Sequence, residues 1–190
     1  MYNIAILASG SGSNAENIIR YFEQHPSIRV TQVLANKPDA YVLERAAKLH
    51  VPARVFNKEE FTSPAFSERL IKEGITHVVL AGFLWLVPQH LIAAFPDHIV
   101  NIHPALLPKY GGKGMYGSKV HESVVAAGEK ETGITIHLVN EEYDKGVHLL
   151  QARCTVVQGD TADAVAAKVH DLEYEHFPRV IENWIINTQS

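Results

Sequence analysis

The amino-acid sequence predicts an α/β fold in which a mostly parallel sheet lies between two layers of helices. Short apolar runs alternate with helical patterns through the first half of the chain, and this alternation is typical of parallel strands joined by crossover helices. After His103 the pattern changes, and two later strand-like runs indicate an antiparallel hairpin. We therefore expect residues 1–190 to form a single domain, a three-layer α/β/α sandwich with a mostly parallel, Rossmann-like sheet.

Apolar segments in the first half have the composition of buried parallel strands. The expected strands are residues 2–8, 29–35, 54–56, 77–81 and 99–102. The helical patterns between them cover residues 15–24, 41–49, 64–73 and 88–94. Asn14 is expected to cap the first of these helices, and Ser63 followed by Pro64 marks the start of the third.

The second half of the chain begins with a loop. Residues 104–117 contain two prolines and four glycines, which favour irregular structure. The later elements are expected at residues 119–127 (helix), 134–139 and 147–157 (hairpin strands joined by residues 140–146) and 161–186 (helix). Pro178 predicts a bend in the last helix, because proline removes one backbone hydrogen bond.

Composition and charge exclude several classes of protein. Lys and Arg number 17 and Asp and Glu 21, so the net charge is −4, and no basic run indicates a nucleic-acid partner. Cys154 is the single cysteine, which excludes an internal disulfide or a cysteine-based zinc site. The longest apolar run, residues 78–87, is about half of a membrane span. The first basic residue is Arg20, so the charged start of a secretory signal is missing, and we expect a cytoplasmic protein without a membrane partner.

A turn rich in glycine and serine joins the first expected strand to the first helix. Its sequence is Ser9-Gly10-Ser11-Gly12-Ser13-Asn14. Glycine lets the backbone approach a ligand, and the helix start offers free N–H groups to an anion such as phosphate. The spacing also fits a dinucleotide-binding fingerprint, but no acidic residue ends the second strand to hold a ribose. A glycine turn without a ligand is the remaining alternative.

Asn101 and His103 lie two residues apart at the end of a strand, so their side chains leave the same face and Ile102 points away. Ligands of parallel sheets bind at the carboxyl ends of strands, which places this pair near the glycine turn. An amide and an imidazole suit a developing oxyanion, although both could instead satisfy loop backbone groups. Asp144 lies in an acidic turn where solvated charge is the simpler interpretation, and His137 could belong to the core or to a site.

Four segments occur here in the order typical of one enzyme family. They are residues 9–14, Leu80-Ala81-Gly82-Phe83, Asn101-Ile102-His103-Pro104-Ala105-Leu106-Leu107-Pro108 and residues 133–146. On these segments the chain resembles the phosphoribosylglycinamide formyltransferases of the small bacterial type over essentially its whole length. The Asn-x-His-Pro block is typical of folate-dependent formyltransferases in general. The serine-rich turn narrows the resemblance to the members that act on glycinamide ribonucleotide. It implies the formyltransferase fold and formyl transfer from 10-formyltetrahydrofolate to the amine of 5'-phosphoribosylglycinamide in purine biosynthesis.

The resemblance also implies roles for individual residues. The implied catalytic residues are Asn101, His103 and Asp144. The implied ribonucleotide-binding residues are Gly12, Ser13, Asn14, Ala15, Glu16, His170 and Glu173. The implied folate-binding residues are Leu84, Trp85, Leu86, Val87, Asn101, Asn140, Glu141, Glu142, Tyr143 and Asp144. The 10-formyltetrahydrofolate acts as co-substrate, no metal is implied, and a monomer or homodimer acting on small molecules is expected.

The implied mechanism begins with attack of the neutral glycinamide amine on the formyl carbon. Asn101 and a protonated His103 would donate to the oxyanion, and Asp144 would raise the pKa of His103 and accept or relay the amine proton. The chain departs from the family near Pro64, where some members have an arginine that contacts folate, and at Trp85, which replaces a more usual basic residue. These departures affect the expected folate site.

Two alternatives stay open. Another folate-dependent N-formyltransferase would share the Asn-x-His block, although a methionyl-tRNA formyltransferase would need a further C-terminal domain and a formyltetrahydrofolate deformylase a further N-terminal one. A non-catalytic nucleotide-binding module would use the glycine turn and leave Asn101 and His103 idle. Binding of NAD compared with binding of glycinamide ribonucleotide discriminates this second alternative.

Overall fold

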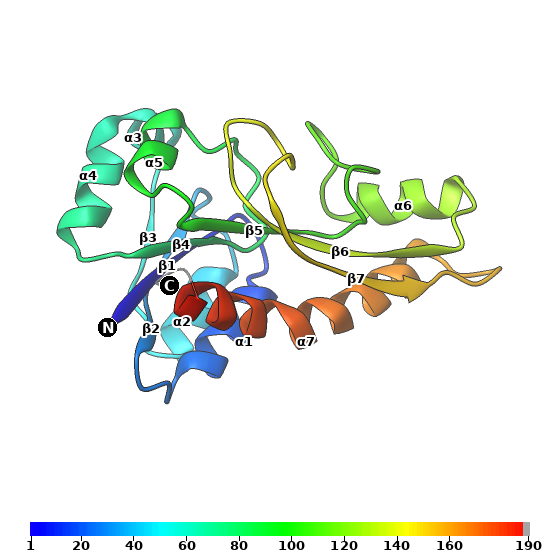
Figure 1. The fold of residues 1–190 in the computed structure, drawn as a ribbon, viewed down its shortest axis with the longest axis horizontal. Coiled ribbons are helices and arrows are strands. Elements are labelled where there is room, and N and C mark those ends of the chain that lie inside the picture. Colours follow the sequence, from blue (N-terminus) through cyan, green and yellow to red (C-terminus); the bar gives the residue numbers. More distant parts are fainter. Residues whose placement is uncertain (188–190) are drawn as a thin grey trace.

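The computed structural model describes residues 1–187, which fold around one seven-stranded sheet (Figure 1). The strands are β1 (Tyr2–Ala8), β2 (Ile28–Ala35), β3 (Ala53–Val55), β4 (His77–Leu80), β5 (Ile99–His103), β6 (Glu131–Leu138) and β7 (His148–Thr155). They lie in the order β3-β2-β1-β4-β5-β6-β7. Strands β1 to β5 are parallel, whereas β6 is antiparallel to both β5 and β7. The expected mostly parallel sheet with a late antiparallel hairpin is confirmed.

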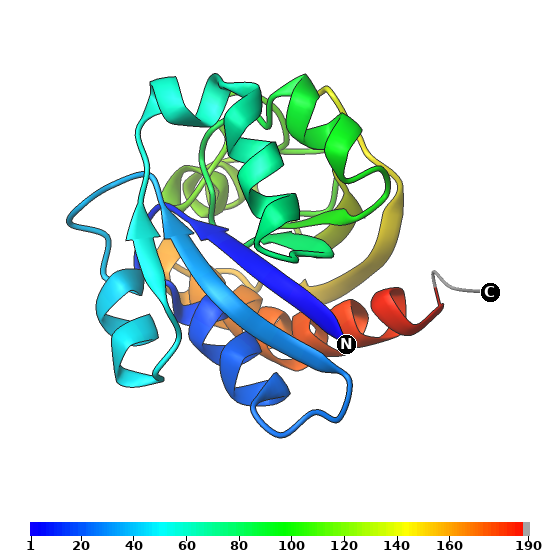
Figure 2. The ribbon, with the colours of Figure 1, turned by 90° about the vertical axis from the view of Figure 1, so that its left-hand side faces the viewer.

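Helices cover both faces of the sheet. They are α1 (Ser13–Phe22), α2 (Val42–Lys48), α3 (Lys58–Thr62), α4 (Pro64–Lys72), α5 (Gln89–Ala94), α6 (Ser118–Ala126) and α7 (Ala162–Asn187). Helices α1, α2 and α7 pack on one face, and α3, α4 and α5 pack on the other (Figures 1 and 2). Helix α6 packs against α7. This arrangement confirms the three-layer sandwich.

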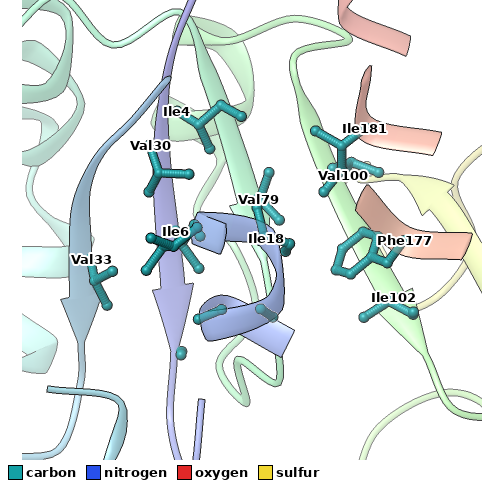
Figure 3. Close-up of a cluster of buried hydrophobic side chains, with 14 of the residues drawn as sticks. Ile4, Ile6, Ile18, Val30, Val33, Val79, Val100, Ile102, Phe177 and Ile181 are labelled. Carbon is teal, nitrogen blue, oxygen red and sulfur yellow. The ribbon is translucent and has the colours of Figure 1, made fainter. Parts of the chain in front are cut away.

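The central strand β1 is buried from both sides. Ile4 packs in the cluster on the α1 and α7 face, whereas Leu7 packs in the cluster on the opposite face. Figure 3 shows the first cluster, where Ile18 of α1 and Phe177 of α7 lie over the sheet and Phe177 lies beside Ile102 of β5. Burial on both faces explains why β1 is a continuous apolar run rather than an alternating one.

Helix α3 is absent from the sequence-based expectation. Its start carries a recognisable cap, since the Asn57 side chain accepts a hydrogen bond of 2.8 Å from the backbone N–H of Glu60. The next helix, α4, begins as predicted, with the Ser63 hydroxyl accepting from Ala65 and Pro64 in the first turn. An Asn followed three residues later by Glu is therefore a sequence sign from which α3 could have been predicted.

The prediction that Asn14 caps the first helix is wrong. Helix α1 begins at Ser13, and its capping residue is Gly12 in the left-handed region at φ 74° with no side-chain cap. Asn14 lies inside the first turn, where its amide donates to Glu173 of α7 at 2.9 Å. The Asn14 side chain is therefore engaged in a tertiary contact with α7 and does not cap its own helix.

The late elements follow the expected order, although β6 begins before its expected start and β7 is shorter than expected. Strand β6 begins at Glu131 and Gly133 pairs with Arg153 of β7, although Gly133 interrupts the apolar pattern. A Cβ at Gly133 would lie 1.8 Å from the Ala152 carbonyl oxygen, so only glycine fits this close pairing. Helix α7 runs without interruption across the buried Pro178. Within residues 1–187, no helix combines the length and the apolar character needed to cross a membrane.

His77 is a buried histidine at the start of β4, at the opposite edge of the sheet from the carboxyl ends of the parallel strands. Its Nδ1 atom lies 2.9 Å from the Thr76 hydroxyl, and its Nε2 atom is buried without a hydrogen-bond partner in the described part of the chain. The ring packs against His98 and Trp184, with centroid separations of 4.5 and 4.9 Å. Burial, assisted by the nearby His98, lowers the pKa of His77 to about 4.

We predict that His77 makes the folded state sensitive to acid. The unfolded chain binds the His77 proton near its ordinary pKa and the folded chain only near pH 4, so stability is lost as pH falls between these values. The loss between about pH 7.5 and 5 should be roughly 1–2 kcal/mol, measured by urea unfolding. His77→Phe should reduce this loss. The control His50→Asn, at an exposed left-handed position, should keep it. An unchanged pH dependence in His77→Phe would contradict the prediction.

Candidate functional site

A cleft of about 590 Å³ lies at the carboxyl ends of the central strands. Its lining comes from the turn after β1, the segment after β4, the end of β5, the loop before α6, the β6–β7 connection and one face of α7. This is the edge at which ligands of parallel sheets bind. The cleft therefore gathers segments from both halves of the chain.

Asn101 and His103 enter this cleft from β5, as their spacing predicts. In the antiparallel pairing of β5 with β6, Asn101 lies opposite His137 and His103 lies opposite Thr135. The Asn101 amide nitrogen is 3.1 Å from Nε2 of His137. Ile102 is buried. The pairing of β5 with β6 therefore places His137 beside the predicted pair of Asn101 and His103.

His103 and His137 each turn one ring nitrogen toward Asp144 and the other toward a backbone carbonyl. His103 donates from Nε2 to the Tyr110 carbonyl at 2.7 Å, and Nδ1 of His137 lies 2.9 Å from the Leu138 carbonyl. The opposite nitrogens, Nδ1 of His103 and Nε2 of His137, lie 3.5 and 3.6 Å from the Asp144 carboxylate. A proton delivered to either inner nitrogen would therefore form an ion pair with a largely buried carboxylate.

Asp144 lines the cleft with a largely buried side chain, and its carboxylate is not a solvated charge. It is held at φ 56°, and its carboxylate accepts a hydrogen bond of 2.9 Å from the Gly112 N–H. Burial by itself raises the pKa of Asp144, but contacts with His137 and His103 and the Gly112 N–H outweigh it, so the pKa lies below its ordinary value. Asp144 is therefore ionised at neutral pH.

His103 does not have the protonation state that the sequence-based mechanism gave it. Burial lowers its pKa, and the charge of Asp144 and the hydrogen bond to Tyr110 only partly offset burial, while His137 lowers it further. The pKa therefore lies below its ordinary value, and His103 is mainly neutral at neutral pH in the free protein. Asp144 raises the pKa of His103 as expected, but burial lowers it by more, so the protonated imidazole of the sequence-based mechanism is not favoured in the free protein at neutral pH.

The glycine turn is fixed by helix α2. The carbonyl oxygens of Gly10 and Ser11 accept hydrogen bonds from the Val42 backbone N–H at 3.1 Å and from Nε of Arg45 at 2.8 Å. Residues 10–14 line the cleft. With these carbonyl groups engaged by α2, the turn and the start of α1 offer N–H groups to an anion.

Glu173 and His170 of α7 lie beside this turn. The Glu173 carboxylate accepts from the Asn14 amide at 2.9 Å and lies 3.2 Å from Nδ1 of His170. Burial raises the pKa of Glu173, although Asn14 and His170 lower it in part. The Oδ1 atom of Asn14 is buried and has no hydrogen-bond partner among the residues that the structure describes. The structure thus brings Gly12, Ser13, Asn14, His170 and Glu173 together at one end of the cleft.

Ala15 and Glu16 do not line the cleft, although both were predicted to bind the ribonucleotide. Ala15 is fully buried in the core. The Glu16 carboxylate is occupied by Arg20 and Arg45, which lower its pKa. Glu16 therefore stabilises the Arg45 side chain that holds the glycine turn, and this partnership depends on residues distant in sequence.

The expected folate segments form the other wall. Leu84, Trp85, Leu86, Val87, Asn140, Glu142, Tyr143 and Asp144 line the cleft, whereas Glu141 does not and instead contacts Gln89 at 3.1 Å. The backbone N–H of Leu84 donates to the Ser9 hydroxyl at 3.0 Å, which joins this wall to the glycine turn. Lys58 lies 4.6 Å from the centre of the Trp85 ring, so a cation remains beside the position where a basic residue is replaced.

Sequence reasoning missed several lining residues. His121 of α6 and Lys113, Met115 and Tyr116 of the preceding loop line the cleft. His137 was left between core and site, and the structure places it in the cleft. Lys113 is the one Lys or Arg among the described lining residues. The loop residues had no sign beyond glycine content, whereas strand pairing with Asn101 could have identified His137.

Comparison with known proteins assigns the class. Residues 2–181 match the family model described as formyl transferase. The chain therefore belongs to the formyl transferase family.

Several similar proteins within this family carry the name of one particular enzyme. The chain is 35% identical to the phosphoribosylglycinamide formyltransferase of Haemophilus influenzae and 33% identical to that of Bacillus subtilis, covering 96% of this chain in each case and 86% and 94% of those proteins. The crystal structure of the enzyme of that name from Streptococcus pneumoniae superimposes with a TM-score of 0.85 at 36% identity, covering 97% of this chain and 99% of that one. The chain spans 63% and 59% of two chloroplastic plant relatives of the same name, from Arabidopsis thaliana and Vigna unguiculata, at 40% and 38% identity over 94% of this chain.

We predict that Gly12 is required for the shape of the turn. It has φ 74°, and an added Cβ would lie 2.3 Å from a methyl carbon of Val42 in α2, whereas a Cβ at Gly10 would meet nothing within 4 Å. Gly12→Ala should lower the free energy of unfolding by about 2 kcal/mol or more, and the matched control Gly10→Ala by about 0.5 kcal/mol or less. Urea unfolding of both variants measures this, and equal losses would contradict the assignment.

Proposed function

We propose that this protein transfers a formyl group from 10-formyltetrahydrofolate to the amine of 5'-phosphoribosylglycinamide, a step of purine biosynthesis. The observation that carries the proposal is the convergence of Asn101, His103 and Asp144 in one cleft with a phosphate-type turn at its other end. The names of the bacterial relatives support the same substrates. In this proposal residues 1–190 act as one domain, the folate is a co-substrate, and the reaction needs no metal.

The cleft has a suitable place for each part of the two substrates. The N–H groups of Gly12, Ser13 and Asn14 bind the phosphate of the ribonucleotide, and Glu173 binds its ribose hydroxyl groups. The folate ring system lies against the wall formed by residues 84–87 and 140–144. The amine and the formyl carbon then meet beside Asn101, His103 and Asp144.

The proposed reaction is a direct transfer. The lone pair of the neutral amine forms a bond to the formyl carbon, and the carbonyl electrons move to oxygen. Asn101 donates to that oxyanion. The proton released by the attacking nitrogen passes to the inner nitrogen of His103, where Asp144 stabilises the positive charge. The electrons of the oxyanion then re-form the carbonyl group and the bond between the formyl carbon and folate N10 breaks. The protonated His103 returns its proton to N10, which releases tetrahydrofolate and leaves His103 neutral again.

The neutral state of His103 fits this order of events. A histidine that is already protonated cannot accept a proton, and burial holds its pKa low until charge develops in the cleft. After it accepts the proton, His103 becomes a charged hydrogen-bond donor facing Asp144. The imidazole therefore acts first as base and then as electrostatic partner.

The direct test of the proposed function is a formyl-transfer assay. The purified protein should consume 10-formyltetrahydrofolate only when glycinamide ribonucleotide is present, and both products should form in equal amounts. Methionyl-tRNA, water alone and formyl-accepting amino sugars serve as competing acceptors that should give no turnover. Turnover with one of these and none with glycinamide ribonucleotide would favour a different formyltransferase, and NAD binding without any turnover would favour a nucleotide-binding module.

We predict that Asp144→Asn lowers kcat by about 10³-fold at neutral pH, because it removes the carboxylate that stabilises the positive charge of His103 after this imidazole accepts the proton. Activity of the wild type should fall on acidification as His103 becomes protonated, with an apparent pKa below the ordinary value for histidine. In Asp144→Asn this fall should move to lower pH, because Asp144 raises the pKa of His103.

The measurement is a profile of kcat and kcat/KM between about pH 5.5 and 8.5. The control Asp39→Asn removes an exposed carboxylate outside the cleft and should leave the profile unchanged. A variant Asp144→Asn that keeps more than about a tenth of the wild-type kcat would place Asp144 outside the chemistry, since such a small loss is far below what these roles supply.

A further inference from the structure

His121 is a buried cleft residue that the proposed reaction does not use. It lies on α6 and lines the cleft, and it is only 7% exposed. Its Nδ1 atom is buried without a hydrogen-bond partner, and no hydrogen bond joins Nε2 to any residue within 1–187. Both polar atoms of one ring therefore lack a protein partner.

An unused imidazole at this depth calls for a ligand. A buried polar group without a partner costs roughly 1–3 kcal/mol, and native structures rarely leave one without a function. Burial and the nearby His170 and His103 lower the pKa of His121, so the ring is neutral at neutral pH. A neutral imidazole carries one N–H donor and one nitrogen acceptor, which matches a group that has both a donor and an acceptor.

The residues around His121 indicate which part of a ligand its ring would contact. Its electrostatic neighbours are His103 at the reacting end and His170 beside Glu173 at the other end. Under the proposed function the ribonucleotide extends between these two ends, with its phosphate at the glycine turn and its amine beside His103. The secondary amide lies between the ribose and the amine-bearing carbon, and it has one N–H and one carbonyl oxygen.

We propose that His121 is a positioning residue that hydrogen-bonds the amide of glycinamide ribonucleotide and so orients the amine toward the formyl carbon. The inference rests on the proposed function. A half-turn of the ring about its Cβ–Cγ bond exchanges Nδ1 with Cδ2 at little change in shape, so either nitrogen can face the ligand. The amide contact distinguishes this substrate from phosphorylated sugars that the phosphate turn and Glu173 would also accept.

The experiment compares three substitutions and two ligands. His121→Phe keeps the ring and removes its hydrogen bonds, whereas His121→Gln and His121→Asn return an amide near Nε2 or Nδ1. The ligands are glycinamide ribonucleotide and ribose 5-phosphate, which lacks the amide. Calorimetry measures Kd for each, and steady-state kinetics gives KM and kcat.

We expect His121→Phe to weaken binding of glycinamide ribonucleotide by about 10- to 100-fold, the value of one to two hydrogen bonds. Binding of ribose 5-phosphate and of a non-reactive folate analogue should stay unchanged. At least one of the Gln and Asn variants should recover most of the loss. Unchanged binding of glycinamide ribonucleotide, or equal weakening for both ribose ligands, would overturn the inference.

A second measurement does not depend on a variant that folds. In the wild-type protein, the ring resonances of His121 should shift on addition of glycinamide ribonucleotide and stay in place on addition of ribose 5-phosphate. Equal shifts with both ligands would contradict the amide contact. A separate outcome concerns the proposed function itself. If the wild type bound ribose 5-phosphate but neither bound nor formylated glycinamide ribonucleotide, the proposed function would be wrong, and the inference would be wrong with it.

Discussion

The carboxylate of Asp144 is the contact on which the geometry of the cleft depends. It joins the Gly112 N–H, His103 of β5 and His137 of β6, all within 3.6 Å or less. A carboxylate buried to this extent is tolerated only when donors surround it. The connection between β6 and β7 and the loop before α6 therefore hold each other in place. Gly146 permits this arrangement, because a Cβ there would lie 1.5 Å from the Leu138 carbonyl oxygen.

The parts of the site that the sequence predicted are those that local geometry determines. Asn101 and His103 share a face because strand side chains alternate, and the glycine turn lies near them because parallel strands end at one edge. The strands of the parallel half were predicted to within one residue. For β1 and β4 the reason is burial on both faces, which gives continuous apolar runs. Such features need no knowledge of which distant residue meets which.

Features that depend on tertiary partners were predicted poorly. Glu16 looked like a ligand for the ribonucleotide, but Arg20 and Arg45 occupy it, and Asn14 looked like a cap, but Glu173 engages its amide. His121 gave no sign at all, because its meaning comes from the way α6 packs on α7. The protonation state of His103 was misjudged for the same reason, since its burial outweighs the charge of Asp144.

The hydrogen bond between Asn14 and Glu173 joins residues 159 positions apart. A ribosome that has made the glycine turn and the Asn101 and His103 pair of β5 has not yet made α7, which brings Glu173 to the cleft beside that turn. A nascent chain therefore has no complete ligand site until α7 has emerged and docked on α1. Because a ligand stabilises only the state that binds it, substrate binding would then protect the assembled chain as one unit and leave incomplete chains unprotected.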